Sequence, residues 1–405
     1  MNNHTGPADI LDRLALAPPR PEDEVWMRMA LEHARLAYGR TAPNPMVGCV
    51  LVRDGQLIGQ GHHARAGLDH AEIAALKDAQ ARGHDPAGAT LYVNLEPCFS
   101  YGRTPPCTLA IIKARIARVV TAMVDPDPRT CGKGLEALID AGIEVTCGVL
   151  EDEAQRLNAP FCTRILHGRP HITAKVAMSL DGKIATRRGD SFPMTGEVAR
   201  QAVHRLRDRV DAILVGRRTV AKDNPRLTCR LGEDMAGPGG ARDPVRIIID
   251  PFLKSPLDAQ IFHLQKRGLS KAPTLLVVSG SVTLGRRRQA LDGLGVEIIA
   301  CPERRGGGLD LKILLEVLVE RGISSVLVEG GGETLARFMD AGVIDAWIAH
   351  VAPVFIGGAT APTPLGGNGV GKLDEATRTQ GAQVRRLGQD IEIAVPVAGH
   401  IYGLD

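Results

Sequence analysis

The chain has 405 residues, 44% of them hydrophobic, which is enough for two separate cores. The net charge is only +3, so there is no bulk electrostatic argument for binding nucleic acid or an anionic membrane. No apolar run reaches the roughly 18 residues that span a bilayer, and residues 1–20 lack the basic and apolar regions of a signal peptide. The eight cysteines are too scattered for a disulfide framework and favour a reduced, cytoplasmic setting.

Residues 1–20 are expected to form a flexible arm, because prolines at 18, 19 and 21 delay the first helix. Residues 21–150 then alternate helical and strand-like patterns. The first helix follows Pro21 and an acidic first turn, and later helices start near 70, 105 and 134. Between them, apolar β-branched runs predict strands at 47–52, 89–93, 118–124 and 143–149. This alternation predicts a layered α/β domain.

The polar segment 151–170 is expected to be a linker, and a second α/β series fills residues 171–405. Its helices include one with an apolar face within 311–318. Its predicted strands lie at 171–178, 210–215, 245–249, 274–278, 296–300, 325–328 and 346–354. The two halves do not resemble each other, so the sequence predicts two different α/β domains.

His70, Glu72, Cys98 and Cys107 form the strongest pattern in the sequence. A catalytic zinc ion commonly takes three protein ligands and keeps a fourth position for water. One imidazole and two thiols meet that count, and zinc lowers the pKa of bound water towards about 7. Cys107 enters a predicted helix, whose N-terminus favours a thiolate. The pattern predicts a zinc site that activates water.

Glu72 is expected near this water but outside the metal's ligand set, where it can carry a proton to a departing amine. In the first turn of a helix, residues two apart can still converge on one site. A lone His-x-Glu or a lone cysteine pair is more often structural, but their joint occurrence favours a deaminase of a heterocyclic base. The eight residues between Cys98 and Cys107 depart from the common Pro-Cys-x-x-Cys signature.

This departure is itself typical of one family. Four segments closely resemble the bifunctional riboflavin-biosynthesis deaminase/reductase family, namely 41–49 (TAPNPMVGC), 67–72 (GLDHAE), 95–98 (LEPC) and 102–107 (GRTPPC). The resemblance implies a cytidine-deaminase-like three-layer domain over 21–150, with His70, Cys98 and Cys107 on zinc and Glu72 as proton shuttle. The implied substrate is a diaminopyrimidinone ribosylamine 5′-phosphate made from GTP.

The second half has no Gly-x-Gly-x-x-Gly motif near its start, so a Rossmann domain is not supported. A glycine turn at 328–335 (VEGGGETL) instead lies between a predicted strand and a helix, where backbone amides can approach a phosphate. Three further segments each resemble, taken singly, a turn with solvated charges, namely 175–185, 223–230 and 357–358.

Together, these segments resemble the second domain of the same family. The resemblance implies a dihydrofolate-reductase-like α/β domain that uses NADPH to reduce the ribosyl group to ribityl, with Lys175 and Asp223 as catalytic candidates. Arg207 and Arg230 suit bidentate phosphate binding. The implied substrate contacts are Ser191, Arg207, Leu227, Arg230 and Glu329, and the implied NADPH contacts are Ala177, Pro193, Thr219, Asp223, Gly331, Gly332, Glu333 and Thr334.

The family also implies a homo-oligomer, a dimer or tetramer, that acts on a small phosphorylated pyrimidine and not on nucleic acid or a membrane. Two positions depart from its pattern: Ser100 replaces a His, and Pro193 replaces a Trp beside the nicotinamide. Neither change removes a group that the chemistry requires, so retuned binding is expected.

Three alternatives stay open at this point. The chain is a deaminase only, with a reductase-like domain impaired at Pro193; or it is a non-catalytic regulatory paralogue; or it deaminates bases within nucleic acid. The last requires a basic surface and stacking aromatics, which the balanced charge and 3% aromatic content disfavour.

Overall fold

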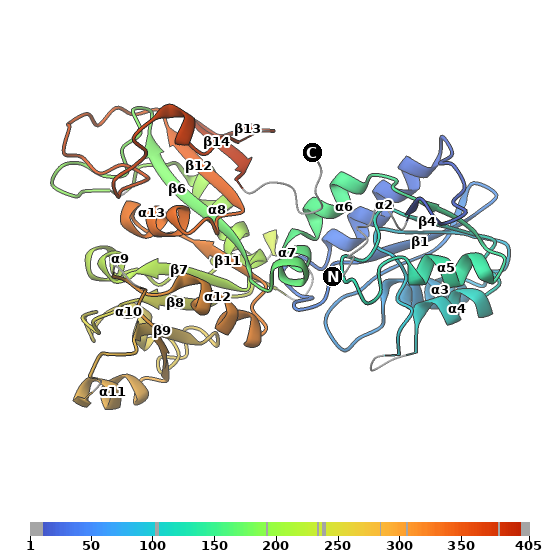
Figure 1. The fold of residues 1–405 in the computed structure, drawn as a ribbon, viewed down its shortest axis with the longest axis horizontal. Coiled ribbons are helices and arrows are strands. Elements are labelled where there is room, and N and C mark those ends of the chain that lie inside the picture. The colour runs from blue at the N-terminus through green and yellow to red at the C-terminus, as the bar shows by residue number, and fades with distance from the viewer. Residues whose placement is uncertain are drawn as a thin grey trace. The chain divides into compact units, whose positions relative to one another are not determined.

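The structure is a computed structural model that describes residues 11–101, 105–191, 193–232, 235–236, 240–283, 285–304, 307–379 and 381–397. The chain divides into two compact units, Met1–Gly168 and Arg169–Asp405 (Figure 1). Residues 1–10 of the predicted arm lie outside the described part of the chain. Both units are α/β, which confirms the predicted fold class.

The first unit is built on a five-stranded sheet of order β2-β1-β3-β4-β5. β1 pairs antiparallel with β2 and β3, whereas β3, β4 and β5 run parallel. The strands are β1 (Gly48–Arg53), β2 (Gln56–His62), β3 (Thr90–Val93), β4 (Arg118–Thr121) and β5 (Glu144–Cys147), and the helices between and around them are α2 (Asp23–Arg35), α3 (Ala71–Ala81), α4 (Cys107–Lys113) and α5 (Lys133–Asp140).

Strand β2 was not predicted, because its sequence QLIGQGH has neither an apolar run nor clear alternation. Its glycines have a packing role. A Cβ on Gly59 would lie 2.5 Å from the Ala75 carbonyl oxygen, and one on Gly61 would lie 2.6 Å from the Ala74 Cβ. The two glycines therefore let α3 pack directly against the backbone of β2, which fixes the position of the first turn of α3.

The segment expected to be a linker is helical. It forms α6 (Glu151–Leu157) and α7 (Ala159–His167), and both helices lie within the first unit. The buried Asn158 between them accepts a hydrogen bond from the Met46 amide at 2.8 Å and donates one to the Met46 carbonyl at 3.0 Å. Segment 151–170 thus contains two short helices, each with buried residues. The division between the two units comes after it begins, at 168/169.

The second unit has a nine-stranded sheet of order β10-β9-β8-β7-β11-β6-β12-β14-β13. The first seven strands in this order are parallel, and β14 and β13 form an antiparallel hairpin at one edge. The strands are β6 (His171–Ser179), β7 (Ala212–Gly216), β8 (Val245–Ile249), β9 (Thr274–Ser279), β10 (Val296–Cys301), β11 (Ser325–Val328), β12 (Ala346–Ala352), β13 (Gln383–Leu387) and β14 (Asp390–Pro396).

The hairpin of β13 and β14 is a second element that was not predicted, whereas every strand predicted before residue 355 is present. Its turn consists of Gly388 and Gln389, and Gly388 has φ 69°. Such a two-residue loop with a glycine at positive φ is the signal that marks the hairpin in the sequence. The helices of this unit are α8 (Glu197–Arg209), α9 (Arg217–Asp223), α10 (Gln260–His263), α11 (Gly285–Asp292), α12 (Leu311–Glu320) and α13 (Gly332–Asp340).

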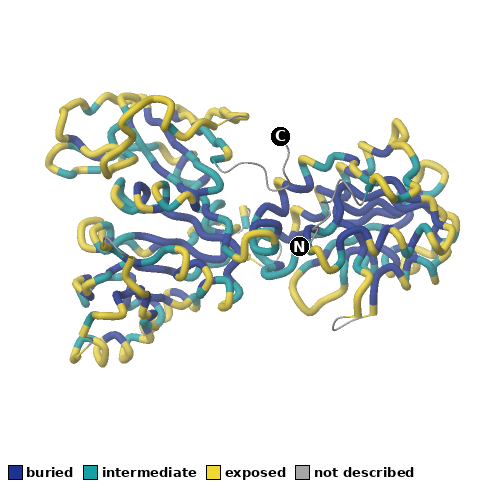
Figure 2. The backbone as a smooth tube through the Cα atoms, in the orientation of Figure 1, coloured by how far each residue is buried: buried dark blue, intermediate teal, exposed yellow. Residues whose placement is uncertain are grey.

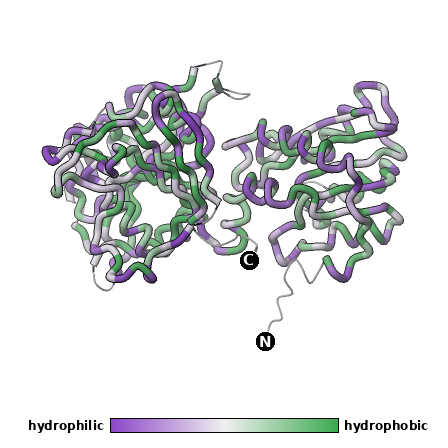
Figure 3. Tube along the Cα trace, turned by 90° about the horizontal axis from the view of Figure 1, so that it is seen from above, coloured by the Kyte–Doolittle hydropathy of each residue, from purple (hydrophilic) through white to green (hydrophobic). Residues whose placement is uncertain are grey.

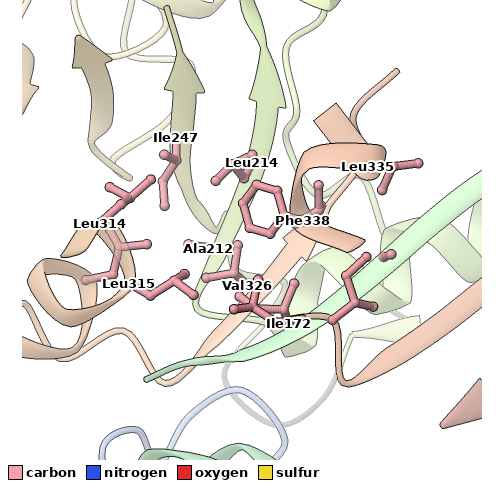
Figure 4. Packing of buried hydrophobic residues seen from close by; sticks show 14 of the residues in the cluster. Ile172, Ala212, Leu214, Ile247, Leu314, Leu315, Val326, Leu335 and Phe338 are labelled. Atoms are coloured by element: carbon pink, nitrogen blue, oxygen red, sulfur yellow. The ribbon is translucent and has the colours of Figure 1, made fainter. Parts of the chain in front are cut away.

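Both faces of the larger sheet are covered. On β7, Ala212 and Leu214 enter one apolar cluster, while Ile213 and Val215 enter the other, as the two-residue period of a strand requires. Figure 4 shows the first cluster, in which Leu314 and Leu315 of α12, and Leu335 and Phe338 of α13, lie over the central strands. The strands are mostly buried (Figure 2) and hydrophobic (Figure 3), which leaves function to their ends and to the loops.

A buried ion pair ties the layers of the first unit together. Arg118 of β4 donates two hydrogen bonds to Asp23 of α2, at 2.7 and 2.8 Å, and both side chains are at most 3% exposed. Arg118 also donates to Thr146 of β5 at 2.8 Å, and the Tyr92 hydroxyl of β3 donates to Asp23 at 3.0 Å. One cluster thus joins a helix to three parallel strands.

Asp23→Asn is expected to destabilise the first unit by about 3 kcal/mol. It removes the buried counter-ion of Arg118 and leaves only the more exposed Glu144, whose Oε1 lies 2.9 Å from the Arg118 Nε. The measurement is urea unfolding followed by Trp26 fluorescence in a Trp347→Phe background, since each unit contains one of the two tryptophans. The control is Glu24→Gln, whose exposed partner Arg28 lies 3.8 Å away. Equal unfolding midpoints for the two variants would show that the buried pair adds no stability.

Candidate functional site

The structure brings His70, Cys98 and Cys107 together. The His70 Nδ1 atom lies 3.5 Å from the Cys98 Sγ and 3.2 Å from the Cys107 Sγ. Their three ligand atoms all lie within 4.8 Å of one another, and within the described ranges this is the one such group of histidine, cysteine or acidic residues. We refer to these three residues as the sulfur–imidazole cluster. Two sulfurs and one imidazole nitrogen suit zinc in number and in softness.

Helix starts place these groups. His70 is the N-cap of α3, and Cys107 is the first residue of α4. The Cys107 amide donates to the Cys98 Sγ at 3.2 Å, and the Thr108 amide donates to the Cys98 carbonyl at 3.3 Å. The pKa of Cys98 falls to about 4, because the Cys107 thiol and His70 hydrogen-bond its sulfur and outweigh its burial. Cys98 is therefore a thiolate at neutral pH, which is the form that binds a metal ion.

Glu72 lies in the first turn of α3 and is only 4% exposed. Burial, followed by the negative charge of Cys98, raises its pKa to about 7, although a hydrogen bond with Cys107 opposes the rise. A carboxyl group with this pKa both accepts and donates a proton at neutral pH. It contacts the sulfur–imidazole cluster through Cys107, which is the placement expected of a proton shuttle beside a metal-bound water.

Glu96 anchors the cysteine loop, a role that the sequence reading did not identify. Its carboxylate accepts backbone hydrogen bonds from Asp125 at 3.0 Å, Gly132 at 2.9 Å and Gly134 at 2.7 Å. A Cβ on Gly134 would lie 2.2 Å from the Pro97 carbonyl oxygen. The loop after β4 is thus held tightly against Pro97, which positions Cys98 next to it.

Asn44 and His63 also adjoin the sulfur–imidazole cluster. The Asn44 amide donates to His63 Nε2 at 3.0 Å, and His63 Nδ1 donates to the Asp69 carbonyl at 2.9 Å. The His63 ring packs edge-on against His70, with ring centroids 5.5 Å apart. Burial lowers the pKa of His63, so its ring is neutral at physiological pH. The signal for Asn44 was present in segment 41–49, but no spacing rule connects His63 to it.

In the second unit, Arg207 of α8 and Glu329, which follows β11, form a half-buried bidentate pair. The Arg207 Nε and Nη2 atoms donate to Glu329 at 3.0 and 2.7 Å, and Nη1 donates to the Thr228 carbonyl at 3.2 Å. The fork of Arg207 is therefore already used by Glu329 and is not free for the bidentate phosphate contact that the sequence suggested. Arg230, in contrast, has an exposed side chain.

Lys175 of β6 lies within electrostatic reach of this pair. Burial lowers its pKa, Glu329 opposes that shift, and Arg207 adds to it. Burial alone would raise the pKa of Glu329, but the charge and hydrogen bonds of Arg207, together with Lys175, hold it below its usual value. A lysine with a lowered pKa beside a permanent carboxylate is a candidate proton donor.

The glycine turn opens α13 and meets the end of β7. A Cβ on Gly216 would lie 2.6 Å from the Thr334 Oγ1, and a Cβ on Gly330 would lie 2.6 Å from the Thr334 Cβ. A Cβ on Gly331 would have no described atom within 4 Å. Thr219 and Glu333 lie in the helices that begin here, α9 and α13, and Arg218 pairs with Glu333. The backbone amides at these two helix starts can receive phosphate oxygens.

Other predicted residues are more dispersed. The Arg230 amide donates to His204 Nδ1 of α8 at 3.3 Å, which places it near Arg207. Leu227 is buried in the apolar cluster with Val220 and Phe262, so only its backbone can contact a ligand. Asp223 ends α9 with an exposed side chain.

Ala177 lies on β6 two residues after Lys175, on the same face of the strand. Two of the predicted segments meet at Asp181, which accepts a hydrogen bond from the Ser179 hydroxyl at 2.6 Å and from the Gly357 amide at 2.7 Å. These contacts close the turn after β6 against the loop after β12.

The two departures from the family pattern lie in loops. Ser100 and Pro193 are exposed, and Ser191 is half-buried. Among the described contacts, none joins Ser191 or Pro193 to Lys175, Arg207 or Glu329. Phe192, which is next to Pro193, lies outside the described residues, as do positions 102–104 of the deaminase segment.

Two family descriptions match the chain. "Cytidine and deoxycytidylate deaminase zinc-binding region" matches residues 20–123, and "RibD C-terminal domain" matches residues 170–393. The first contains the whole sulfur–imidazole cluster, and the second contains Lys175, Arg207 and Glu329. None of the described helices has the length and apolar character needed to cross a membrane.

Curated relatives match over nearly their whole length. The riboflavin biosynthesis protein RibD of Aquifex aeolicus is 40% identical over 92% of this chain and 98% of its own, and that of Bacillus amyloliquefaciens is 39% identical over 93% and 97%. Among solved structures, Acinetobacter baumannii RibD matches with a TM-score of 0.78 at 37% identity, over 93% of this chain and 99% of that one.

A Thermotoga maritima diaminohydroxyphosphoribosylaminopyrimidine deaminase/5-amino-6-(5-phosphoribosylamino)uracil reductase matches over the same shares, 93% and 99%, with a TM-score of 0.79 at 34% identity. The resemblance inferred from the sequence motifs is thereby confirmed.

The raised pKa of Glu72 predicts a pH-dependent stability in metal-free protein. The folded state keeps the Glu72 proton up to about pH 7, whereas the unfolded state loses it near 4.5, so stability falls as pH rises through this window. From pH 5 to pH 8, chelator-treated wild type is expected to lose about 3 kcal/mol more than Glu72→Gln. Urea unfolding at both pH values measures this difference, and parallel losses in the two proteins would contradict it.

Proposed function

Because the chain belongs to the RibD family of bifunctional riboflavin-biosynthesis enzymes, we propose which residues carry out its deaminase and its reductase reactions. We assign the deaminase domain to the first unit, up to Gly168, and the reductase domain to the second. The substrate is a small phosphorylated pyrimidine, the diaminopyrimidinone ribosylamine 5′-phosphate. The family resemblance and the cysteine usage support a cytoplasmic homo-oligomer that binds neither nucleic acid nor a membrane.

The observation that carries the deaminase assignment is the convergence of His70 Nδ1 and the two cysteine sulfurs within 4.8 Å, with Glu72 in contact. His70, Cys98 and Cys107 would hold zinc, and the donor set fits that ion in number and softness. Bound zinc supplies hydroxide at neutral pH. Glu72 accepts a proton from the attacking water and delivers it to the departing amino group, so that ammonia leaves.

Asn44 and His63 complete the deaminase pocket. Because His63 Nδ1–H is fixed on the Asp69 carbonyl, its Nε2 is a hydrogen-bond acceptor that orients the Asn44 amide. The Asn44 carbonyl oxygen then accepts from a donor on the pyrimidine ring. Ser100, on the exposed loop, supplies a smaller contact than the family's histidine.

For the reductase, bound NADPH would supply the hydride for C1′ of the opened sugar. Gly331, Gly332, Glu333 and Thr334 would hold its phosphates, because the glycine turn offers backbone amides and the space beside Gly331 is open. Ala177 and Thr219 extend this surface, and Pro193 replaces a flat aromatic wall beside the nicotinamide.

Substrate binding in the second unit centres on Glu329, which Arg207 holds as a carboxylate. Lys175 is the acid that provides the proton accompanying hydride transfer, and Asp223 adjoins the cofactor. Arg230, with its exposed guanidinium, binds the 5′-phosphate, while Ser191 and the backbone at Leu227 contact the sugar. A deaminase with an impaired reductase is the second candidate, and the exposed Pro193 is the observation that favours it.

Cys107→Ser is expected to lose bound zinc and ammonia release, whereas Glu72→Gln is expected to keep zinc and lose at least about a hundredfold in ammonia release. Metal analysis and an ammonia assay measure the two effects separately. Cys49→Ser is the matched control, since Cys49 is buried in β1 and is not part of the sulfur–imidazole cluster. Turnover by Glu72→Gln close to that of wild type would remove Glu72 from its role.

Gly331→Val is expected to raise the KM for NADPH about tenfold or more with unchanged stability, because the side chain enters open space where the cofactor would lie. Gly332→Val is the contrasting variant. There a Cβ would lie 2.5 Å from the Thr363 carbonyl oxygen, so the fold itself is disturbed. Ammonia release stays normal in both. An unchanged KM in Gly331→Val would place the cofactor elsewhere.

A further inference from the structure

The loop after α9 has an unusual backbone conformation at Leu227. This residue has φ 54°, a left-handed value that a bulky side chain adopts only where its surroundings enforce it. The carbonyl of the next residue, the buried Thr228, accepts a hydrogen bond from Arg207 Nη1 at 3.2 Å. The Cys229 amide then donates to Asp243 Oδ1 at 2.7 Å. Side chains from elsewhere in the unit therefore fix the backbone of this loop.

Arg230, the next residue of the loop, is fixed in the same way by His204. The Arg230 amide donates a hydrogen bond to His204 Nδ1 at 3.3 Å. We refer to residues 228–230 as the anchored segment. His204 and Arg207 lie three residues apart on α8, and so on the same face of that helix. The helix face that holds the anchored segment is therefore the face whose Arg207 binds Glu329, at the centre of the reductase site.

The half-buried ring of His204 is neutral and offers a defined acceptor. Burial, followed by the positive charges of Arg207 and Arg230, lowers its pKa to about 4. At physiological pH the imidazole therefore carries a single proton. Because Nδ1 accepts from the Arg230 amide, that proton lies on Nε2. A doubly protonated ring cannot accept this bond, so the neighbouring arginines keep His204 in the form that holds the anchored segment.

The guanidinium of Arg230 has its donors available for an anion. Its two basic neighbours are occupied, since Arg207 binds Glu329 and Arg226 donates to Gln260 at 2.8 Å. The Arg230 side chain is exposed, and no group in the described part of the chain hydrogen-bonds its guanidinium. Burial, followed by the charges of Arg207 and Arg226, lowers its pKa, which means that the site favours an added negative charge. Where this guanidinium lies depends on the backbone of the anchored segment.

We propose that His204 is a positioning residue of the reductase: by accepting the Arg230 amide, its Nδ1 fixes the anchored segment and holds the Arg230 guanidinium where the 5′-phosphate of the substrate binds. This role rests on the one given to Arg230 under Proposed function, and His204 itself needs no contact with the substrate. It explains why a polar ring stands beside Arg207 on α8, where packing alone would be served by an apolar side chain.

Two substitutions of His204 separate positioning from packing. Asparagine keeps an acceptor, its Oδ1, near the place of the histidine Nδ1, whereas leucine fills a similar space and has no acceptor. We expect His204→Leu to raise the reductase KM for the deaminated, phosphorylated substrate about tenfold, with kcat within about twofold of wild type. We expect His204→Asn to keep this KM within about threefold of wild type. The KM for NADPH is expected to stay unchanged in both variants.

The 5′-phosphate provides a readout that a merely structural role would not move. For the same substrate without its phosphate, His204→Leu and wild type are expected to have equal kcat/KM, because Arg230 then has no anion to bind. Arg230→Ala is expected to raise KM for the phosphorylated substrate, and adding His204→Leu to it is expected to raise KM no further. Gln201→Leu is the matched control with wild-type kinetics, since Gln201 is half-buried and lies one turn earlier on α8.

A KM for His204→Asn as high as that for His204→Leu, or an equal loss by His204→Leu on the substrate without phosphate, would overturn the proposal. Additive effects of His204→Leu and Arg230→Ala would do the same. The His204→Asn result decides alone if leucine disturbs the fold. Arg230→Ala distinguishes this failure from a failure of the proposed function. If Arg230→Ala keeps the wild-type KM, the phosphate role of Arg230 is wrong; if Arg230→Ala raises KM and His204→Leu does not, only the role of His204 is wrong.

Discussion

Strand direction decides where chemistry is possible in both units. Parallel strands buried on two faces have no free polar surface along their length, so ligands are met at their carboxyl ends, where loops and helix N-termini emerge. Cys98 follows β3, the loop held by Glu96 follows β4, and the glycine turn follows β11. The topology of the sheets therefore gathers the residues that we assign to zinc and to the phosphates of the cofactor, whereas Lys175 lies within β6.

Charge burial is handled differently in the two units. In the first, Asp23 and Arg118 bind each other and, through Tyr92 and Thr146, join a helix to three strands. In the second, the pairs Arg207–Glu329 and His350–Glu392 keep a carboxylate ionised while leaving an electrostatic coupling to Lys175. The first arrangement stabilises a fold, and the second adjusts the pKa of Lys175, to which we assign a role in the reduction.

The sequence predicted most of what depends on local patterns. Apolar β-branched runs gave β3, β8 and β11 within a residue or two. Spacing together with residue type singled out His70, Cys98 and Cys107, whose ligand atoms the fold brings within 4.8 Å of one another. Strand β2 was missed because glycine has a low strand propensity. The glycines of β2 are required instead by the close packing of α3. The sequence did not reveal that segment 151–170 contains α6 and α7, because both helices are short and each buries only some of its residues.

What the sequence could not supply are partnerships between distant positions. His63 joins Asn44 only after β2 has folded back on β1. The pairing of Ala177 with His350 likewise needs a strand order that no single segment encodes. For the same reason, the sequence suggested that the Arg207 guanidinium binds a phosphate. In the fold, this guanidinium donates two hydrogen bonds to Glu329.

Two separate sites in one chain are proposed to act on the same molecule in sequence. The direct measurement supplies zinc-loaded protein with the undeaminated diaminopyrimidinone ribosylamine 5′-phosphate and NADPH, and follows ammonia and NADPH together. Ammonia is expected to appear first, and one NADPH is then oxidised for each ammonia released. Ammonia release without any NADPH oxidation would leave a deaminase alone, and NADPH oxidation without ammonia would contradict the order of the two reactions.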